Sequence, residues 1–271
     1  MSTENSPLPH SLKKCGLPAE IDFTLNGVRT TFHIENSTVI PKYCYAYRIL
    51  FDKVRIPPII TSIEEGAFKD TNVHYIDIPI TVTSIGSSVF ANCELQELKI
   101  PKSILEISEG LACNCKLQRV TFHSHLTSIQ SNAFSCCKLV NVTIPNSVIY
   151  IGANAFSSNS NLNEFYFPKN MKEISEGVLK SCFKLTKVQL PVEVTCIRKT
   201  AFMDCEKLIN IKIPKTVELV EEKAFWGCKN VKELIFNETC ILKNEAIALC
   251  TSLTNLIVPN VNKKNYKCRR V

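Results

Sequence analysis

The chain lacks the features that would place it in a membrane or a secretory pathway. No window of about 18 apolar residues is long enough for a spanning helix, and the N-terminus has no apolar stretch typical of a signal peptide. We therefore expect a cytoplasmic protein, with either side of the plasma membrane as an alternative location. In the cytosol the fourteen cysteines would stay reduced, and the Asn-x-Ser/Thr matches at Asn36, Asn141 and Asn237 would stay unglycosylated.

Motifs of common catalytic sites are also missing. The chain has only 8 glycines and 5 histidines, with no glycine-rich phosphate loop and no Gly-x-Ser-x-Gly nucleophile elbow. His123 and His125 are close in sequence, but the other histidines are scattered, so a turn explains the pair better than a metal site. Carboxylates such as Glu97 and Glu164 have no matching histidine or cysteine neighbour. We expect no enzyme, no metal and no cofactor.

Positive charge is concentrated at one end of the chain. The net charge is +7, but residues 260–271 hold five basic residues and no acid, which leaves 27 basic and 25 acidic residues in the remainder. A nearly neutral body argues against nucleic acid as a partner, because that binding needs clustered Lys and Arg on a continuous surface.

The chain does contain an internal repeat of 22 or 23 residues. In each repeat, two apolar residues alternate as in a short strand with one buried side, and Pro follows at once in eight of the ten repeats. Proline lacks the N–H that a sheet needs, so each strand should end there. The ten apolar sets are Phe51-Val54-Ile56, Val73-Ile76-Ile78, Leu95-Leu98-Ile100, Leu117-Val120-Phe122, Leu139-Val142-Ile144, Leu162-Phe165-Phe167, Leu185-Val188-Leu190, Leu208-Ile211-Ile213, Val231-Leu234-Phe236 and Leu253-Leu256-Val258.

Each repeat continues with a second aliphatic position and then a pair such as Ala133-Phe134. We expect the Phe to fill the core opposite the strand, while the Ala permits a tight turn or a one-turn helix. Three residues after the Phe position, seven of nine repeats carry Cys. Equivalent positions on stacked coils lie about 4.8 Å apart, which favours a ladder of small buried thiols over a tetrahedral metal cage or disulfides.

These patterns divide the chain into four parts. Residues 1–18 are expected to be a flexible leader, and residues 19–50 a capping hairpin with a degenerate first coil. Alternating apolar residues on either side of Asn26-Gly27 predict that hairpin. The repeats at 51–259 would stack as a solenoid, which a hairpin would close at its first edge. Residues 260–271 form a basic tail.

The repeat resembles that of the BspA-like leucine-rich repeat family. Leu139-Val-Asn-Val-Thr-Ile-Pro145, followed by Ile151-Gly-Ala-Asn-Ala-Phe156, shows the family pattern, and Ala112 and Leu179 depart from it at the Phe position. The resemblance implies a mainly β leucine-rich repeat solenoid of about ten coils, with short parallel strands on a concave face and turns or one-turn helices opposite. It also implies a non-catalytic scaffold that binds proteins, in some members for adhesion or contact with a host or cell surface.

The same pleat identifies a candidate binding surface. Residues that alternate with the buried ones should face outward, and they vary from repeat to repeat, as a protein-binding surface does. The partner would be a protein of unknown identity. The residues that we expect to contact it are Tyr75, Asp77, Glu97, Lys99, Arg119, Glu164, Tyr166, Lys187, Ile235 and Ile257.

The basic tail offers an alternative function. Cys268 is fourth from the end, the position that is prenylated in Cys-aliphatic-aliphatic-x signals, but Arg269 and Arg270 occupy the aliphatic positions. Basic residues alone contribute about 1 kcal/mol each on an anionic lipid surface. A peripheral membrane protein held by this tail is therefore the alternative to a protein-binding scaffold.

Overall fold

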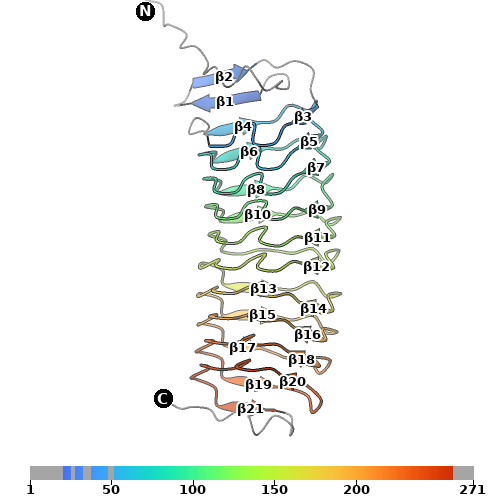
Figure 1. Cartoon of the computed structure of the whole chain (residues 1–271), viewed down its shortest axis with the longest axis vertical. Helices are drawn as coiled ribbons and strands as arrows, with labels where there is room; N and C mark the ends of the chain where they lie inside the picture. The colour runs from blue at the N-terminus through green and yellow to red at the C-terminus, as the bar shows by residue number, and fades with distance from the viewer. Residues whose placement is uncertain (1–20, 26–27, 33–37, 48–51, 259–271) are drawn as a thin grey trace, which may run out of the picture.

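The computed structural model describes residues 21–25, 28–32, 38–47 and 52–258, and these residues form one long stack of coils (Figure 1). Most coils place one short strand in each of two columns that run the length of the stack. No helix occurs among the described residues, so the segments that carry the Ala-Phe pairs are turns rather than one-turn helices. The predicted β-solenoid is confirmed.

The first column contains the strands that the alternating apolar residues predict. Each three-residue strand buries its central side chain and turns the flanking side chains outward. Neighbouring strands pair in parallel, for example Leu98 with Val120. The strands are β4 (Lys53–Arg55), β6 (Tyr75–Asp77), β8 (Glu97–Lys99), β10 (Arg119–Thr121), β13 (Glu164–Tyr166), β15 (Lys187–Gln189), β17 (Asn210–Ile211), β19 (Glu233–Ile235) and β21 (Asn255–Ile257).

A second column of parallel strands was not predicted. The aliphatic residues after each proline, expected only as core anchors, lie in two-residue strands that pair between coils, as Ile129 does with Ile151. The strands are β3 (Val39–Ile40), β5 (Ser62–Ile63), β7 (Ser84–Ile85), β9 (Glu106–Ile107), β11 (Ser128–Ile129), β12 (Tyr150–Ile151), β14 (Glu173–Ile174), β16 (Cys196–Ile197), β18 (Leu219–Val220) and β20 (Ile241–Leu242).

An antiparallel hairpin lies over the first edge of the first column. Strand β1 (Ile21–Leu25) pairs with β2 (Val28–Phe32) and, on its other side, with β4, where Phe23 is opposite Val54. Strand β4 therefore has a partner on both edges, since it also pairs with β6. The predicted turn at Asn26-Gly27, the leader 1–18 and the tail 260–271 lie outside the described residues.

Aromatic side chains fill the core between the two columns and the turns. Phe68 and Phe90 stack with their ring centroids 5.9 Å apart, and both are fully buried. The ladder is interrupted at Ala112 and Leu179, where the family pattern also fails. Beside the first gap, Phe122 packs from the strand side against Phe134 at 5.6 Å. A small residue on the turn side is thus matched by a large one on the strand side, which keeps the interior filled.

The cysteines form the predicted ladder, and each thiol also makes a hydrogen bond. Cys205 Sγ donates to the carbonyl oxygen of Leu179 at 3.2 Å, and Cys228 Sγ donates to that of Phe202 at 3.1 Å. The acceptor lies in the preceding coil each time, so the thiols link successive turns. Cys93, Cys115, Cys137, Cys182 and Cys250 make the equivalent bond. Burial raises the pKa of the Cys137 and Cys182 thiols to about 12.

Coil length changes once near the middle of the stack. Strands β8 and β10 are offset by 22 residues, as Glu97 pairs with Arg119, whereas β13 and β15 are offset by 23, as Glu164 pairs with Lys187. The extra residue lies just before the strand. There it forms a turn, closed at its first occurrence by the Leu162 N–H donating to the carbonyl of Asn159 at 3.1 Å.

The first column is interrupted next to this change. The sequence predicts a strand at 141–143, but the structure has none, and this prediction is wrong. Val140 still donates to the carbonyl of Gln118 at 3.3 Å and accepts from Asn163 at 3.2 Å. No backbone hydrogen bond in this described part of the chain joins 141–143 to β10 or β13.

Candidate functional site

All ten residues predicted to bind a partner lie on the outward side of the first column, which we call the strand face. Nine of them are exposed, and Glu164 is half-buried. Their buried neighbours, such as Leu98 and Val188, fix the orientation of the strands. The face consists of Lys53, Arg55, Tyr75, Asp77, Glu97, Lys99, Arg119, Thr121, Asn141, Thr143, Glu164, Tyr166, Lys187, Gln189, Asn210, Lys212, Glu233, Ile235, Asn255 and Ile257.

The structure pairs several of the predicted residues with one another or with a neighbour. Arg119 Nη1 lies 2.6 Å from Glu97 Oε1, and Arg55 Nε lies 3.9 Å from Asp77 Oδ2. These side chains are exposed, so each pair contributes little to stability, roughly 0 to 1 kcal/mol. A binding partner can exchange such pairs at small cost.

Glu164, Tyr166 and Lys187 form a cluster near the middle of the face. The Tyr166 hydroxyl donates to the Glu164 carboxylate, and Lys187 Nζ lies over the Tyr166 ring, 5.2 Å from its centroid. Interaction with the Tyr166 hydroxyl and the nearby Glu164 carboxylate raises the pKa of Lys187. The cluster holds an exposed aromatic ring in a defined position, which reduces the entropy lost on binding.

The C-terminal end of the strand face is apolar. Ile235 and Ile257 are directly opposite each other in the β19–β21 pair, and they are 43% and 51% exposed. Adjacent exposed aliphatic side chains on a regular sheet are unfavourable in water, and they provide the apolar contact area that protein interfaces bury.

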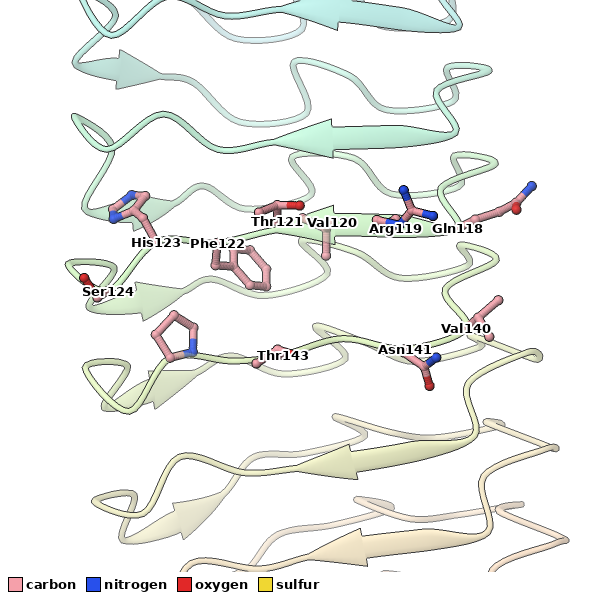
Figure 2. A pocket seen from close by; sticks show the side chains of 11 residues that line it. Gln118, Arg119, Val120, Thr121, Phe122, His123, Ser124, Val140, Asn141 and Thr143 are labelled. Atoms are coloured by element: carbon pink, nitrogen blue, oxygen red, sulfur yellow. The ribbon is translucent and has the colours of Figure 1, made fainter.

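A groove of about 700 Å³ opens on the strand face where the first column is interrupted. Figure 2 shows the labelled lining side chains on two consecutive coils, from Gln118 to Ser124 on one and from Val140 to Thr143 on the next. Because 141–143 makes no ladder bonds, the two coils are not joined there by backbone hydrogen bonds. The lining residues are Gln118, Arg119, Val120, Thr121, Phe122, His123, Ser124, Val140, Asn141, Thr143 and Pro145.

His123 replaces the usual proline at one end of this groove. Its Nε2 lies 2.8 Å from the carbonyl oxygen of Ile104, and its Nδ1 accepts the backbone N–H of His125 at 3.2 Å. A carbonyl only accepts, so Nε2 carries the proton and the imidazole is neutral in this arrangement. His123 therefore has the structural role in a turn that the sequence suggests.

The sequence identified the outward residues of the face but missed the groove. Gln118, His123, Ser124, Val140 and Pro145 line it without having been predicted as site residues. Two signals were available: His123 stands where most repeats have Pro, and the repeat lengthens just after the following coil. Neither signal shows by itself that the coils separate on one side only.

The described residues contain no group of three or more His, Cys, Asp or Glu side chains that could hold a metal ion. Twelve cysteines within these ranges are free thiols. No described helix is long and apolar enough to cross a membrane. Cys268 and the rest of the basic tail lie outside the described residues, so membrane attachment through the tail stays a prediction.

The fold is shared with solved leucine-rich repeat structures. Superposition on a leucine-rich repeat protein from Bacteroides ovatus gives a TM-score of 0.70 at 24% identity, covering 90% of this chain and 71% of that one. The pneumococcal vaccine antigen PcpA gives 0.60 at 23%, with the same coverages. A leucine-rich repeat protein of T. pallidum gives 0.52 at 23%, covering 84% and 97%. At these identities, the likeness concerns the fold alone.

Sequence comparison assigns the family. No curated protein sequence matches the chain at a significant level. The family described as BspA type leucine rich repeat region matches in six copies, over residues 38–116, 84–208 and 172–268. These ranges include nearly all of the coils, and the repeat pattern and the fold agree with the match. The chain belongs to the BspA-type leucine-rich repeat family.

Proposed function

We propose that this repeat scaffold binds another protein through its strand face. The observation that carries the proposal is the contrast between the two sides of each first-column strand. Residues such as Leu98 and Leu234 are buried and uniformly aliphatic, whereas the outward residues change character from coil to coil. Stability requires only the buried set, so the outward set is free to specify a partner.

The exposed anchors on the face support a protein partner. Tyr75 and Tyr166 are 50% and 41% exposed, and Ile235 and Ile257 form the apolar end. Tyrosine is enriched among residues that dominate binding energy, and apolar side chains supply buried area. We place this binding in adhesion between surfaces, because the chain shares its fold with a pneumococcal vaccine antigen.

Two variants of the strand face test the proposal. The first changes Glu164 and Tyr166 together to Ser, and the second changes Ile235 and Ile257 together to Ser. Tagged full-length protein is incubated with an extract of its own host, cross-linked through lysines and digested for mass spectrometry. We expect partner cross-links at lysines of the strand face and loss of those cross-links in both variants, with an unchanged circular dichroism spectrum.

Val192→Ser provides the matched control. Val192 is 70% exposed but follows Pro191, outside the strand face, so its substitution removes an exposed aliphatic side chain elsewhere on the molecule. We expect Val192→Ser to retain every partner cross-link. Equal recovery of partners by all variants would contradict the proposal, as would cross-links that map mainly to lysines away from the strand face.

A further inference from the structure

The charges of the strand face are not balanced by their internal pairing. Each of its four carboxylates has a partner within the chain: Arg55 for Asp77, Arg119 for Glu97, the Tyr166 hydroxyl for Glu164, and the Asn255 amide for Glu233. Three cations of the face have no such partner among the described residues, namely Lys53, Lys99 and Lys212. The face therefore offers unmatched positive charge, while its carboxylates are already satisfied.

Lys99 brings this unmatched charge to the edge of the groove. In the β8–β10 pair Lys99 is directly opposite Thr121, which lines the groove. None of the eleven lining residues is a carboxylate, and Arg119 contributes a second cation. The potential in and beside the groove is therefore positive, and it favours an anionic group on a ligand.

The backbone of the groove also has unused donors. In the preceding coil the Arg119 N–H donates to the carbonyl of Gln96 at 3.3 Å, but the equivalent N–H of Asn141 makes no hydrogen bond in the described structure. The N–H of Thr143 is likewise without an acceptor. The side-chain amides of Gln118 and Asn141 add further donors beside them. A ligand that supplies carbonyl and carboxylate oxygens at regular intervals would satisfy these groups.

We propose that the groove between β10 and residues 141–145 binds an extended, acidic peptide segment of the protein partner. Carboxylates of the peptide lie near Lys99 and Arg119, and its backbone carbonyls accept from the open edge at Asn141 and Thr143. The inference rests on the proposed function, since it names the chemistry of the partner that the strand face receives. It also assigns a role to the interrupted column, which is otherwise a defect in the stack.

Synthetic peptides provide a direct probe. A capped peptide of alternating Asp and Thr residues is titrated into the ¹⁵N-labelled full-length chain, in parallel with its Asn/Thr and Lys/Thr counterparts. We expect the Asp/Thr peptide alone to shift the side-chain amide signals of Gln118 and Asn141 and the backbone signals of Thr121 and Thr143. Added salt should weaken this binding, because exposed charges are screened.

Two matched substitutions locate the site. Asn141→Asp places a carboxylate in the groove, and Asn210→Asp makes the same change in the same outward row but three coils away. We expect Asn141→Asp to weaken binding of the Asp/Thr peptide by about fivefold or more, as a surface charge interaction does, and Asn210→Asp to change it less than twofold. Lys99→Gln should weaken binding, whereas Lys102→Gln, on the same coil but outside the face, should not.

Each other outcome overturns the inference. Absence of binding, or equal binding of the Asp/Thr and Asn/Thr peptides, excludes an acidic ligand. Equal loss in Asn141→Asp and Asn210→Asp excludes the groove and leaves a diffuse charge effect. In either case, partner cross-links on the strand face that depend on Ile235 and Ile257 would still support the proposed function. Loss of those cross-links from the strand face would reject the proposed function instead.

Discussion

The side chain of Asn159 accepts a hydrogen bond from the backbone N–H of Leu139, with 3.2 Å between Oδ1 and N. Its Nδ2 donates to the carbonyls of Phe134 and Phe156, at 2.9 Å each. Asn159 occupies a position of the cysteine ladder and is fully buried. A thiol there could reach the Phe134 carbonyl but could not also accept from Leu139. The amide thus joins a coil of the shorter kind to one of the longer kind.

We predict that Asn159→Ala lowers the free energy of unfolding by about 2 to 4 kcal/mol, because buried backbone groups lose their hydrogen-bond partners. Asn159→Cys restores a donor for the Phe134 carbonyl and should cost less. Urea unfolding followed by circular dichroism measures both. Asn163→Ala, at an exposed position nearby, serves as the control. A cost below about 1 kcal/mol for Asn159→Ala would show that the junction closes without the amide.

The thiol hydrogen bonds predict a difference between alanine and serine in the ladder. Cys205→Ala removes the donor to the Leu179 carbonyl and leaves a small cavity, for which we expect a loss of about 1 to 3 kcal/mol. Cys205→Ser keeps a donor and should retain part of the stability. Urea midpoints of the two variants give the comparison. If the two variants lose the same stability, the thiol acts only by filling space.

Burial of the thiols predicts a dependence of stability on pH. The folded pKa of Cys137 and Cys182 is raised to about 12, whereas an unfolded thiol titrates near 8.5. Below pH 8.5 both states hold the proton and this stability is fully present. Between about pH 8.5 and 12 the unfolded chain binds fewer protons, so the free energy of unfolding falls by about 1.4 kcal/mol per pH unit for each such thiol.

Urea midpoints measured between about pH 7.5 and 10 test this dependence. Lysines and tyrosines also titrate in this range, so the comparison is with the Cys137→Ser, Cys182→Ser double variant, which should show a shallower decline. Parallel slopes for the two proteins would exclude the buried thiols as the cause.

The exposure of the cysteines predicts which of them react in the folded protein. Cys136 is exposed and Cys113 half-buried, whereas Cys182, Cys205 and Cys228 are fully buried. The thiolate is the reactive form, and burial suppresses it. Iodoacetamide should therefore modify Cys136 first, and should modify the three buried thiols only in urea. Peptide mass mapping follows each site. Early labelling of Cys205 would show that the ladder opens under native conditions.

Two glycines are required where successive coils are closest. A Cβ on Gly152 would lie 2.5 Å from the backbone nitrogen of Ser131, and one on Gly86 would lie 2.5 Å from that of Glu65. We predict that Gly152→Ala costs about 1 to 3 kcal/mol, since the backbone must shift. Gln130→Ala, at the equivalent position one coil earlier, should be nearly neutral. Urea unfolding measures both, and a neutral Gly152→Ala would show that the second column spreads easily.

The periodic residues made the fold predictable, and departures from the period limited the prediction. Leu95, Leu98 and Ile100 recur with one spacing, and that spacing determines which side chains are buried. The second column was missed because two-residue strands such as Ser128–Ile129 are too short to show alternation. The missing strand at 141–143 was not foreseen because its own sequence, with Val142 between polar residues, is that of a regular strand. Its cause lies in the longer coil that follows.

The strand face was predictable as a surface but not as a set of interactions. Alternation places Glu97 and Arg119 outward, and only the 22-residue register brings them opposite each other. The groove depends on how two adjacent coils separate, which no single repeat encodes. The unpaired Lys99 becomes informative only when every neighbouring carboxylate has been assigned a partner.

The change in coil length at Asn159 restricts how genes of this type can grow by duplication. Copying one whole coil from either side of the junction adds a unit that fits both neighbours and lengthens the strand face by one row. A recombination that fuses a shorter coil directly to a longer one needs an asparagine at the seam, or it leaves the N–H equivalent to that of Leu139 without a partner. The junction therefore divides the protein into two stretches that can gain or lose coils independently.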